Sequence, residues 1–120
     1  MSISDFASST TAGATNFEVG VSGCAVETTD REISTVFVGN QVTTSGNLGN
    51  TGSAGDVEIQ ILDTAGTVID FTSYFTGDAD LTLTAGETSA SANYTAQYYS
   101  AGTPTAGDVT ASLQYAVTYL

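Results

Sequence analysis

The 120-residue sequence contains no histidine and no lysine, and it has one cysteine, Cys24. Without histidine, Ser-His-Asp triads, Cys-His pairs, imidazole bases and histidine metal ligands are excluded. A lone cysteine without a histidine partner is also a poor nucleophile, and it cannot form a disulfide within the chain. The composition therefore predicts a protein that is not an enzyme, and it indicates no cofactor and no metal.

Basic residues are almost absent. Arg31 is the single basic residue and 13 residues are acidic, which gives a formal net charge of −12. This charge repels phosphate backbones and anionic lipid surfaces, so nucleic acid is not expected as a partner. No apolar run approaches the ~18 residues of a membrane span, and no membrane insertion is expected. The acids are scattered along the chain, which is typical of a solvated coat that keeps a protein soluble.

Apolar residues instead recur with a period of two, which is typical of strands with one buried face. Shorter β-rich runs cover residues 33–38, 67–71 and 81–84, and no window has the period of an amphipathic helix. The clearest alternations are Phe17, Val19 and Val21; Val57, Ile59 and Ile61; Ala90, Ala92, Tyr94, Ala96 and Tyr98; and Val109, Ala111, Leu113, Tyr115, Val117 and Tyr119.

Turn and loop signals separate these runs, which favours an antiparallel β-sandwich of short strands. The longest loop is expected at residues 43–55, which are rich in Gly, Ser, Thr and Asn. The other signals are Gly39-Asn40, residues 63–66, Gly77-Asp78, Ala85-Gly86 and residues 101–107.

Three short motifs carry possible chemistry, and each has a simpler interpretation. Residues 63–66 read Asp-Thr-Ala-Gly, but the Asp-Thr-Gly loop of aspartic proteases needs glycine where Ala65 stands, so a hairpin turn is expected. Asp78-Ala79-Asp80 offers oxygens to Ca²⁺ but lacks the other ligands of a calcium loop. Asn93-Tyr94-Thr95 is a formal glycosylation sequon, but it lies within a strand pattern.

From Phe17 onward the sequence resembles the pilin domain of chaperone–usher fimbriae, as in the major subunits of type 1 and P pili. The segment DVEIQILDTAGTVID, residues 56–70, is similar to a pilin segment of the form V-x-I-Q-I-L-D-x-x-G. Residues 94–99, YTAQYY, are similar to the pilin F-x-A-x-Y strand. The chain ends in AGDVTASLQYAVTYL, which has the penultimate aromatic, Tyr119, and the glycine fourteenth from the end, Gly107, of pilin final strands.

The N-terminal half fits the pilin pattern in two ways. One mapping places residues 17–24 and Val36-Phe37-Val38-Gly39 on the third and fourth pilin strands, where a cysteine precedes a V-x-F-x-G strand. This mapping is preferred because residues 47–55 then lead into the I-Q-I-L strand. The other mapping places residues 17–24 and 36–39 on the first and second strands. Either mapping leaves two strands' worth of sequence missing, and Cys24 without the partner that the resemblance implies.

The resemblance implies an incomplete immunoglobulin-like β-sandwich whose open groove is completed by a strand donated from another subunit. It implies a structural, adhesive subunit of an extracellular, cell-surface fimbria, which polymerises head to tail with copies of itself. A periplasmic chaperone and an outer-membrane usher are the implied assembly partners. The groove-edge strand comprises Gly107, Val109, Ala111, Leu113, Tyr115, Val117 and Tyr119.

Residues 1–16 are expected to form an N-terminal extension, and residues 17–120 the domain. The extension is the candidate donor strand, with Ile3 and Phe6 as anchors and the small residues Ala12, Gly13 and Ala14 suited to a narrow groove; the alternative is a disordered tail. It has neither the basic nor the apolar region of a secretion signal. Two other functions remain open, a decoration or spike protein of a virus particle and a carbohydrate-binding sandwich.

Overall fold

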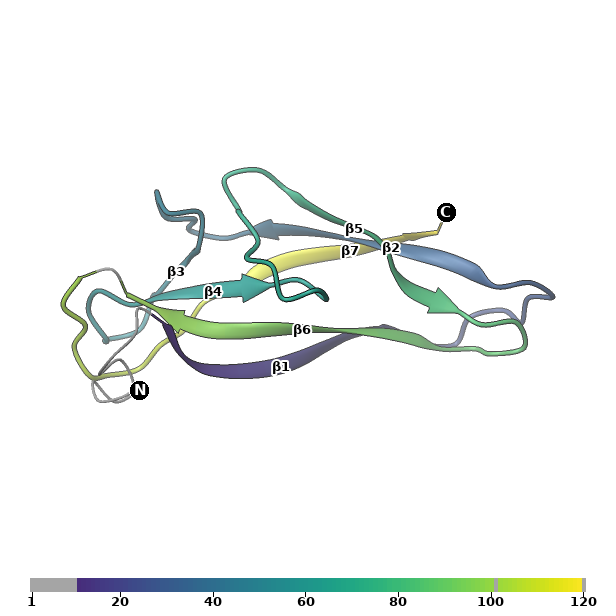
Figure 1. The fold of residues 1–120 in the computed structure, drawn as a ribbon, viewed down its shortest axis with the longest axis horizontal. Coiled ribbons are helices and arrows are strands. Elements are labelled where there is room, and N and C mark those ends of the chain that lie inside the picture. The colour runs from purple at the N-terminus through teal and green to yellow at the C-terminus, as the bar shows by residue number, and fades with distance from the viewer. Residues whose placement is uncertain (1–10, 101, 120) are drawn as a thin grey trace.

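The computed structural model describes residues 11–100 and 102–119, which form seven strands and no helix. The strands build two antiparallel sheets in an elongated molecule of 54 × 25 × 21 Å (Figure 1). One sheet has the order β1-β6-β4-β3 and the other β5-β2-β7. The bounds are β1 Thr11–Val21, β2 Arg31–Gly39, β3 Leu48–Gly49, β4 Glu58–Leu62, β5 Phe75–Leu83, β6 Ala90–Tyr99 and β7 Leu113–Tyr119.

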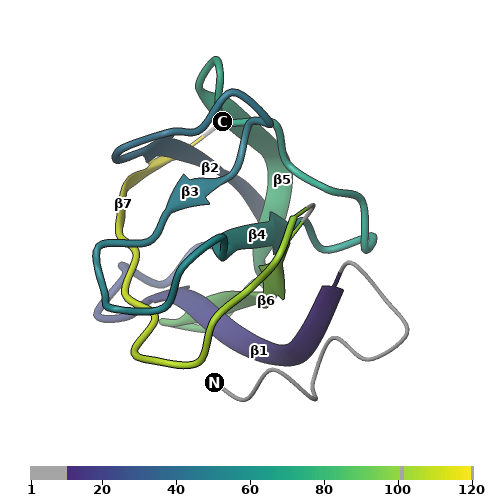
Figure 2. The same ribbon diagram turned by 90° about the vertical axis from the view of Figure 1, so that its left-hand side faces the viewer.

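The predicted all-β sandwich is confirmed by this arrangement. Viewed end on, the two sheets lie as separate layers with β2 in one and β6 in the other (Figure 2). Within residues 11–100 and 102–119, nothing resembles a helix that is long and apolar enough to cross a membrane.

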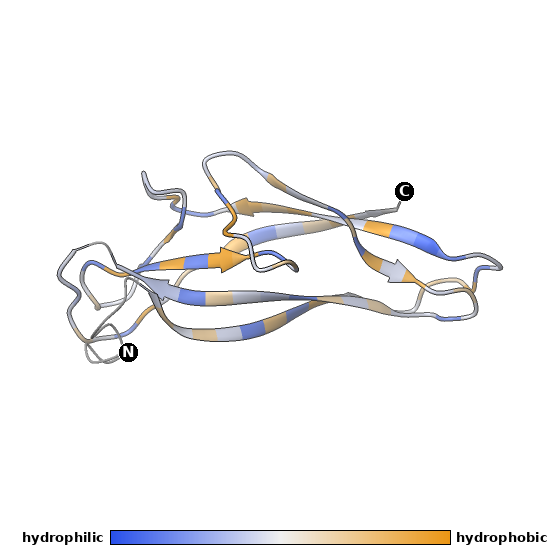
Figure 3. Ribbon diagram, in the orientation of Figure 1, coloured by the Kyte–Doolittle hydropathy of each residue, from blue (hydrophilic) through white to orange (hydrophobic). Residues whose placement is uncertain are grey.

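The core lies between the two sheets and consists mainly of apolar side chains, and the polar residues Ser34, Thr35 and Gln60 of the central strands are also buried. Hydrophilic and hydrophobic colours alternate along β4 in Figure 3, and in its sequence EIQIL the polar Gln60 separates Ile59 from Ile61. Each buried aliphatic or aromatic side chain contributes about 1.5–3 kcal/mol to stability. The buried cluster consists of Val19, Ile33, Phe37, Leu48, Ile61, Ile69, Phe71, Leu81, Leu83, Ala92 and Tyr94.

β5 corrects one expectation, because the turn predicted at Gly77-Asp78 lies inside this strand. The register between β2 and β5 shifts between Ile33 and Thr35, and Ala79 has a φ of 56°. A step of two residues in β2 therefore faces a step of four in β5, and such a β-bulge bends a strand without ending it. Ser34 Oγ accepts the backbone N–H of Ala79 at 3.1 Å and so supports the bulge.

The predicted hairpin turn at residues 63–66 is present. Asp63 N donates to Thr67 O at 2.8 Å, and Asp63 Oδ1 accepts the backbone N–H groups of Ala65 and Thr67. The strand predicted at residues 67–71 is reduced to an isolated bridge between Leu62 and Val68. The chain then leaves the sheet, and Phe71 N donates to Gly46 O at 2.8 Å.

Two boundaries differ from the sequence pattern. β1 begins at Thr11, so the expected division after Asn16 falls within a strand. Thr11 and Ala12 pair with Tyr99 and Tyr98 of β6, and a register shift separates them from Thr15. The long loop expected at residues 43–55 contains the two-residue strand β3, which pairs with β4.

Candidate assembly site

β7 forms one border of the sheet β5-β2-β7, and residues 107–112 lead into it. Residues 107–119 together are called the assembly edge below. β7 pairs antiparallel with β2 from Gly39↔Leu113 to Ile33↔Tyr119. Within residues 11–100 and 102–119, no strand pairs with the other side of β7. A strand with one unpaired side offers backbone N–H and C=O groups to another chain.

Except at Tyr115, which is exposed, residues 107–118 alternate between half-buried and exposed. The positions Val109, Ala111, Leu113 and Val117 are half-buried, whereas the even positions from Asp108 to Thr118 are exposed. Ala111, Leu113 and Val117 pack against the buried cluster without being covered themselves.

Tyr115 shows most clearly that this inward-facing row is uncovered. It lies directly opposite Phe37, so both side chains are on the same face of the sheet. Phe37 is 0% exposed and Tyr115 is 60% exposed. The core covering that Phe37 receives therefore ends before β7, and an apolar row remains beside an unpaired strand edge.

Gly107 begins the assembly edge and has a structural reason for being glycine. Its φ of +154° is rare for residues with a side chain. A Cβ atom there would lie 2.6 Å from Ser53 Oγ and 2.7 Å from the backbone nitrogen of Ala54. The assembly edge and the loop at Ser53 thus approach each other too closely for any side chain.

Behind the edge, a buried polar chain connects both sheets. Tyr94 of β6 is fully buried, and its hydroxyl donates to Asp80 Oδ2 at 2.8 Å and lies 2.8 Å from Thr35 Oγ1. Burial raises the pKa of the Tyr94 hydroxyl above its ordinary value, and the Asp80 carboxylate adds to that rise. The Tyr94 ring also packs against Phe17 and Phe37. These contacts fix the spacing between the sheets.

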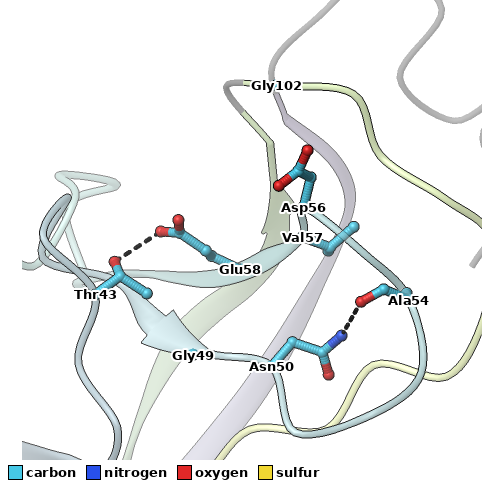
Figure 4. Close-up of a pocket in the computed structure, with 8 residues that line it drawn as sticks. All are labelled: Thr43, Gly49, Asn50, Ala54, Asp56, Val57, Glu58 and Gly102. Atoms are coloured by element: carbon cyan, nitrogen blue, oxygen red, sulfur yellow. Dashed lines mark hydrogen bonds between the residues drawn. The ribbon is translucent and has the colours of Figure 1, made fainter.

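A polar hollow of about 390 Å³ lies near the end of the molecule where β3 and β4 meet (Figure 4). Two acidic side chains, Asp56 and Glu58, border it. Thr43 Oγ1 donates to Glu58 Oε1 at 2.8 Å, and Thr103 N donates to Asp56 Oδ2 at 3.3 Å. The carboxylates therefore hold neighbouring loops, and the described residues contain no group of three or more Cys, Asp or Glu side chains suited to a metal.

The candidate donor residues are placed unequally. Ile3 and Phe6 lie outside the described residues. Ala12, Gly13 and Ala14 belong to β1, where a Cβ atom on Gly13 would lie 2.9 Å from Tyr98 Cε2. Ala12 pairs with Tyr98 of β6, and Gly13 and Ala14 lie in the register shift that follows it. Cys24 is half-buried in the connection after β1, where its N–H donates to Thr88 O at 2.9 Å.

Sequence patterns missed the residues that hold the first half of the assembly edge. Asn50 and Ser53 bind backbone N–H groups of Thr110 and Asp108 at 2.7 and 3.0 Å. Both lie in the segment expected to be a simple loop. The Asn-x-Gly spacing of Asn50 and Gly52 suits an Asx turn, and this was the available signal.

The chain matches the family of fimbrial proteins over residues 1–120. It is 33% identical over 114 residues to the F17 fimbrial protein of Escherichia coli, an alignment that covers 89% of this chain and 63% of that protein. The chain therefore spans less than two thirds of the length of this curated relative.

Two solved structures share the fold. An antigen and type I fimbria protein of Burkholderia pseudomallei is 29% identical, with a TM-score of 0.65 over 91% of this chain and 70% of that one. A subunit in the structure of a chaperone–usher pilus is 17% identical, with a TM-score of 0.68 over 100% of this chain and 77% of that one. The second likeness bears on the fold alone.

Proposed function

Because the chain belongs to the fimbrial protein family, we propose that it is a structural subunit of a cell-surface fimbria, built by strand donation between copies. The observation that carries this proposal is the row of half-covered apolar side chains beside the unpaired side of β7. A donated strand would pair with that side and cover the row. At ~25 cal/mol per Å² of apolar surface, covering these side chains is worth several kcal/mol to the assembly.

The donor is the segment that precedes β1, with Ile3 and Phe6 as its apolar anchors. Ala12, Gly13 and Ala14 lie within β1 of their own chain, so we place the donor before that strand. The domain proper then begins at Thr11. A donor on one copy and an acceptor edge on another make a head-to-tail contact, which gives a filament when it does not close into a ring.

We propose a chaperone and an usher as partners, because the unfilled edge needs protection before assembly. A chaperone strand would occupy the assembly edge in the periplasm until the donor replaces it. We propose no enzymatic role, since the family is one of fimbrial proteins and the chain has no histidine. Membership of the fimbrial protein family does not favour a virus-particle protein.

Electron microscopy of the purified chain tests the proposal, with a variant lacking residues 1–10 as its partner. Thin filaments are expected from the full chain and folded monomers from the shortened variant, because β1 to β7 remain intact. The matched variant Ile3→Asp with Phe6→Asp should also fail to form filaments. Filaments of normal length from either variant would exclude this donor, and monomers alone from the full chain would exclude the function.

A further inference from the structure

The first half of the assembly edge, residues 107–112, is held in place by a loop instead of a strand. β2 ends at Gly39, and Asn40 N donates to Ser112 O at 3.2 Å. Beyond that point Thr51 N donates to Thr110 O at 2.8 Å, and Ala54 N donates to Asp108 O at 3.0 Å. Residues 50–55, called the strap below, therefore take over from β2 along the same side of the edge.

Asn50 connects the strap to the assembly edge through side-chain hydrogen bonds. Its Oδ1 atom accepts the N–H groups of Gly52 and Thr110, both at 2.7 Å. Its Nδ2 atom donates to Ala54 O at 2.9 Å and to Asp108 O at 3.3 Å. Two donors and two lone pairs are the full capacity of an asparagine amide, so every hydrogen-bonding position of Asn50 is used. Figure 4 shows the Asn50 amide directed at the carbonyl of Ala54.

The strap also packs closely against the assembly edge. Ser53 Oγ accepts the N–H of Asp108 at 3.0 Å, and Thr105 N donates to Gly55 O at 3.0 Å. A Cβ atom at Gly52 would collide with Asp108 O, just as one at Gly107 would collide with Ser53. Contacts from both directions thus fix the distance between the strap and residues 105–110.

We propose that Asn50 is a positioning residue for assembly, which holds residues 108–112 extended so that the donated strand can pair along the whole assembly edge. This inference rests on the proposed function. Backbone groups of successive strand residues point to opposite sides, so binding Asp108, Thr110 and Ser112 on the strap side leaves Val109 and Ala111 facing the open side. Without the strap, only β7 itself is held in a pairing geometry.

The test compares Asn50→Ala and Asn50→Asp with the control Asn40→Ala. Asn40 Nδ2 donates to Ser112 Oγ at 2.9 Å, so the control removes an amide contact on the same edge without touching its backbone. Asn50→Asp keeps the acceptor for Thr110 but sets a second acceptor against the carbonyls of Ala54 and Asp108. Hydrogen exchange of the monomer and the initial rate of filament growth are measured for each variant.

The Thr110 amide should exchange about tenfold faster in Asn50→Ala, because one or two hydrogen bonds are lost there. Filament growth should fall by a similar factor, with Asn50→Asp intermediate and Asn40→Ala unchanged. Far-ultraviolet circular dichroism confirms that each variant is folded. Only a positioning role predicts that growth follows the exchange of Thr110 through this series.

Normal growth of Asn50→Ala filaments with a fast-exchanging Thr110 amide would overturn the inference and leave the proposed function standing. An unchanged Thr110 amide would overturn it as well. Absence of filaments from the unmodified chain would overturn the proposed function itself, and the inference with it, so the unmodified chain tells the two failures apart.

Discussion

Phe37 and Tyr115 lie directly opposite each other across β2 and β7, yet Phe37 is 0% exposed and Tyr115 is 60% exposed. Two side chains on the same face of one sheet differ this much only when the layer that covers the first does not reach the second. The difference locates the border of the core at β7. It also makes Tyr115 a side chain that a further strand would bury.

Replacing Tyr115 should separate assembly from monomer stability. Tyr115→Ser is expected to change the free energy of unfolding of the monomer by no more than about 1 kcal/mol, because an exposed cross-strand residue contributes little. The filament should lose resistance to denaturant, because the donated strand would bury less apolar surface. The control is Tyr74→Ser, which removes a tyrosine that is 69% exposed and lies outside the edge. Equal effects of both variants on filaments would contradict this assignment.

Tyr94→Phe should destabilise the monomer by about 1–3 kcal/mol, because it leaves Asp80 and Thr35 without their shared hydroxyl partner. Urea unfolding at neutral pH measures this free energy. Tyr74→Phe removes an exposed hydroxyl and should have almost no effect. If the two variants have the same unfolding midpoint, the polar chain between the sheets is not a stabilising connection.

Ionisation of the Asp70 carboxyl group should make a small part of the folding stability depend on pH. Thr72 donates to Asp70 Oδ1 through its backbone N–H at 2.9 Å and its hydroxyl at 2.7 Å. These two hydrogen bonds lower the pKa of Asp70 below its ordinary value of 3.8, and the backbone hydrogen bond has the larger effect. A group with a lowered folded-state pKa stabilises the fold above its unfolded-state pKa, and this contribution is lost as the pH falls through the folded-state pKa.

Urea unfolding of the native chain and of Asp70→Asn between pH 6 and pH 2 tests this predicted loss of stability in acid. The native chain should lose stability below about pH 4 more steeply than Asp70→Asn, because asparagine does not titrate. Parallel profiles of the two proteins would show that the Thr72 contacts do not stabilise the ionised form.

Gly107→Ala should cost more stability than Gly66→Ala, although both glycines have a positive φ. Gly66 has a φ of +84° and open space where a Cβ atom would lie. Alanine there should therefore lower the free energy of unfolding only through backbone strain, by about 1–2 kcal/mol. At Gly107 the contacts with Ser53 and Ala54 add to a similar strain. Urea unfolding of both variants gives the comparison. An equal cost at the two positions would mean that the strap moves aside freely.

The sequence predicted the features of this fold that depend on side-chain alternation. The β1, β4, β6 and β7 patterns come from single rows of apolar residues, and the buried residues Val19, Ile61, Ala92 and Tyr94 belong to those rows. Tyr115 of β7 departs from this rule because it is 60% exposed. The turn at Asp63 was also predictable, because an Asp side chain binding the N–H groups two and four residues later is a local feature.

Features that depend on distant partners were not predictable. Gly77-Asp78 has turn composition, but the strand continues through a bulge that Ser34 supports from a neighbouring strand. Thr11 and Ala12 carry no strand signal, and their pairing depends on Tyr98 and Tyr99 in β6. The same holds for Asn50, whose partner Thr110 lies 60 residues along the chain.

The central claim is that the open side of the assembly edge receives a strand from another copy, and hydrogen exchange of the filament tests it most directly. The N–H groups of Val109, Ala111, Leu113, Tyr115 and Val117 face that side, since Asn40 pairs with Ser112 on the other. These five amides should exchange rapidly in the monomer and slowly in the filament, whereas those of Gln114, Ala116 and Thr118 are protected in both. Equally rapid exchange of the five amides in the filament would contradict strand donation at this edge.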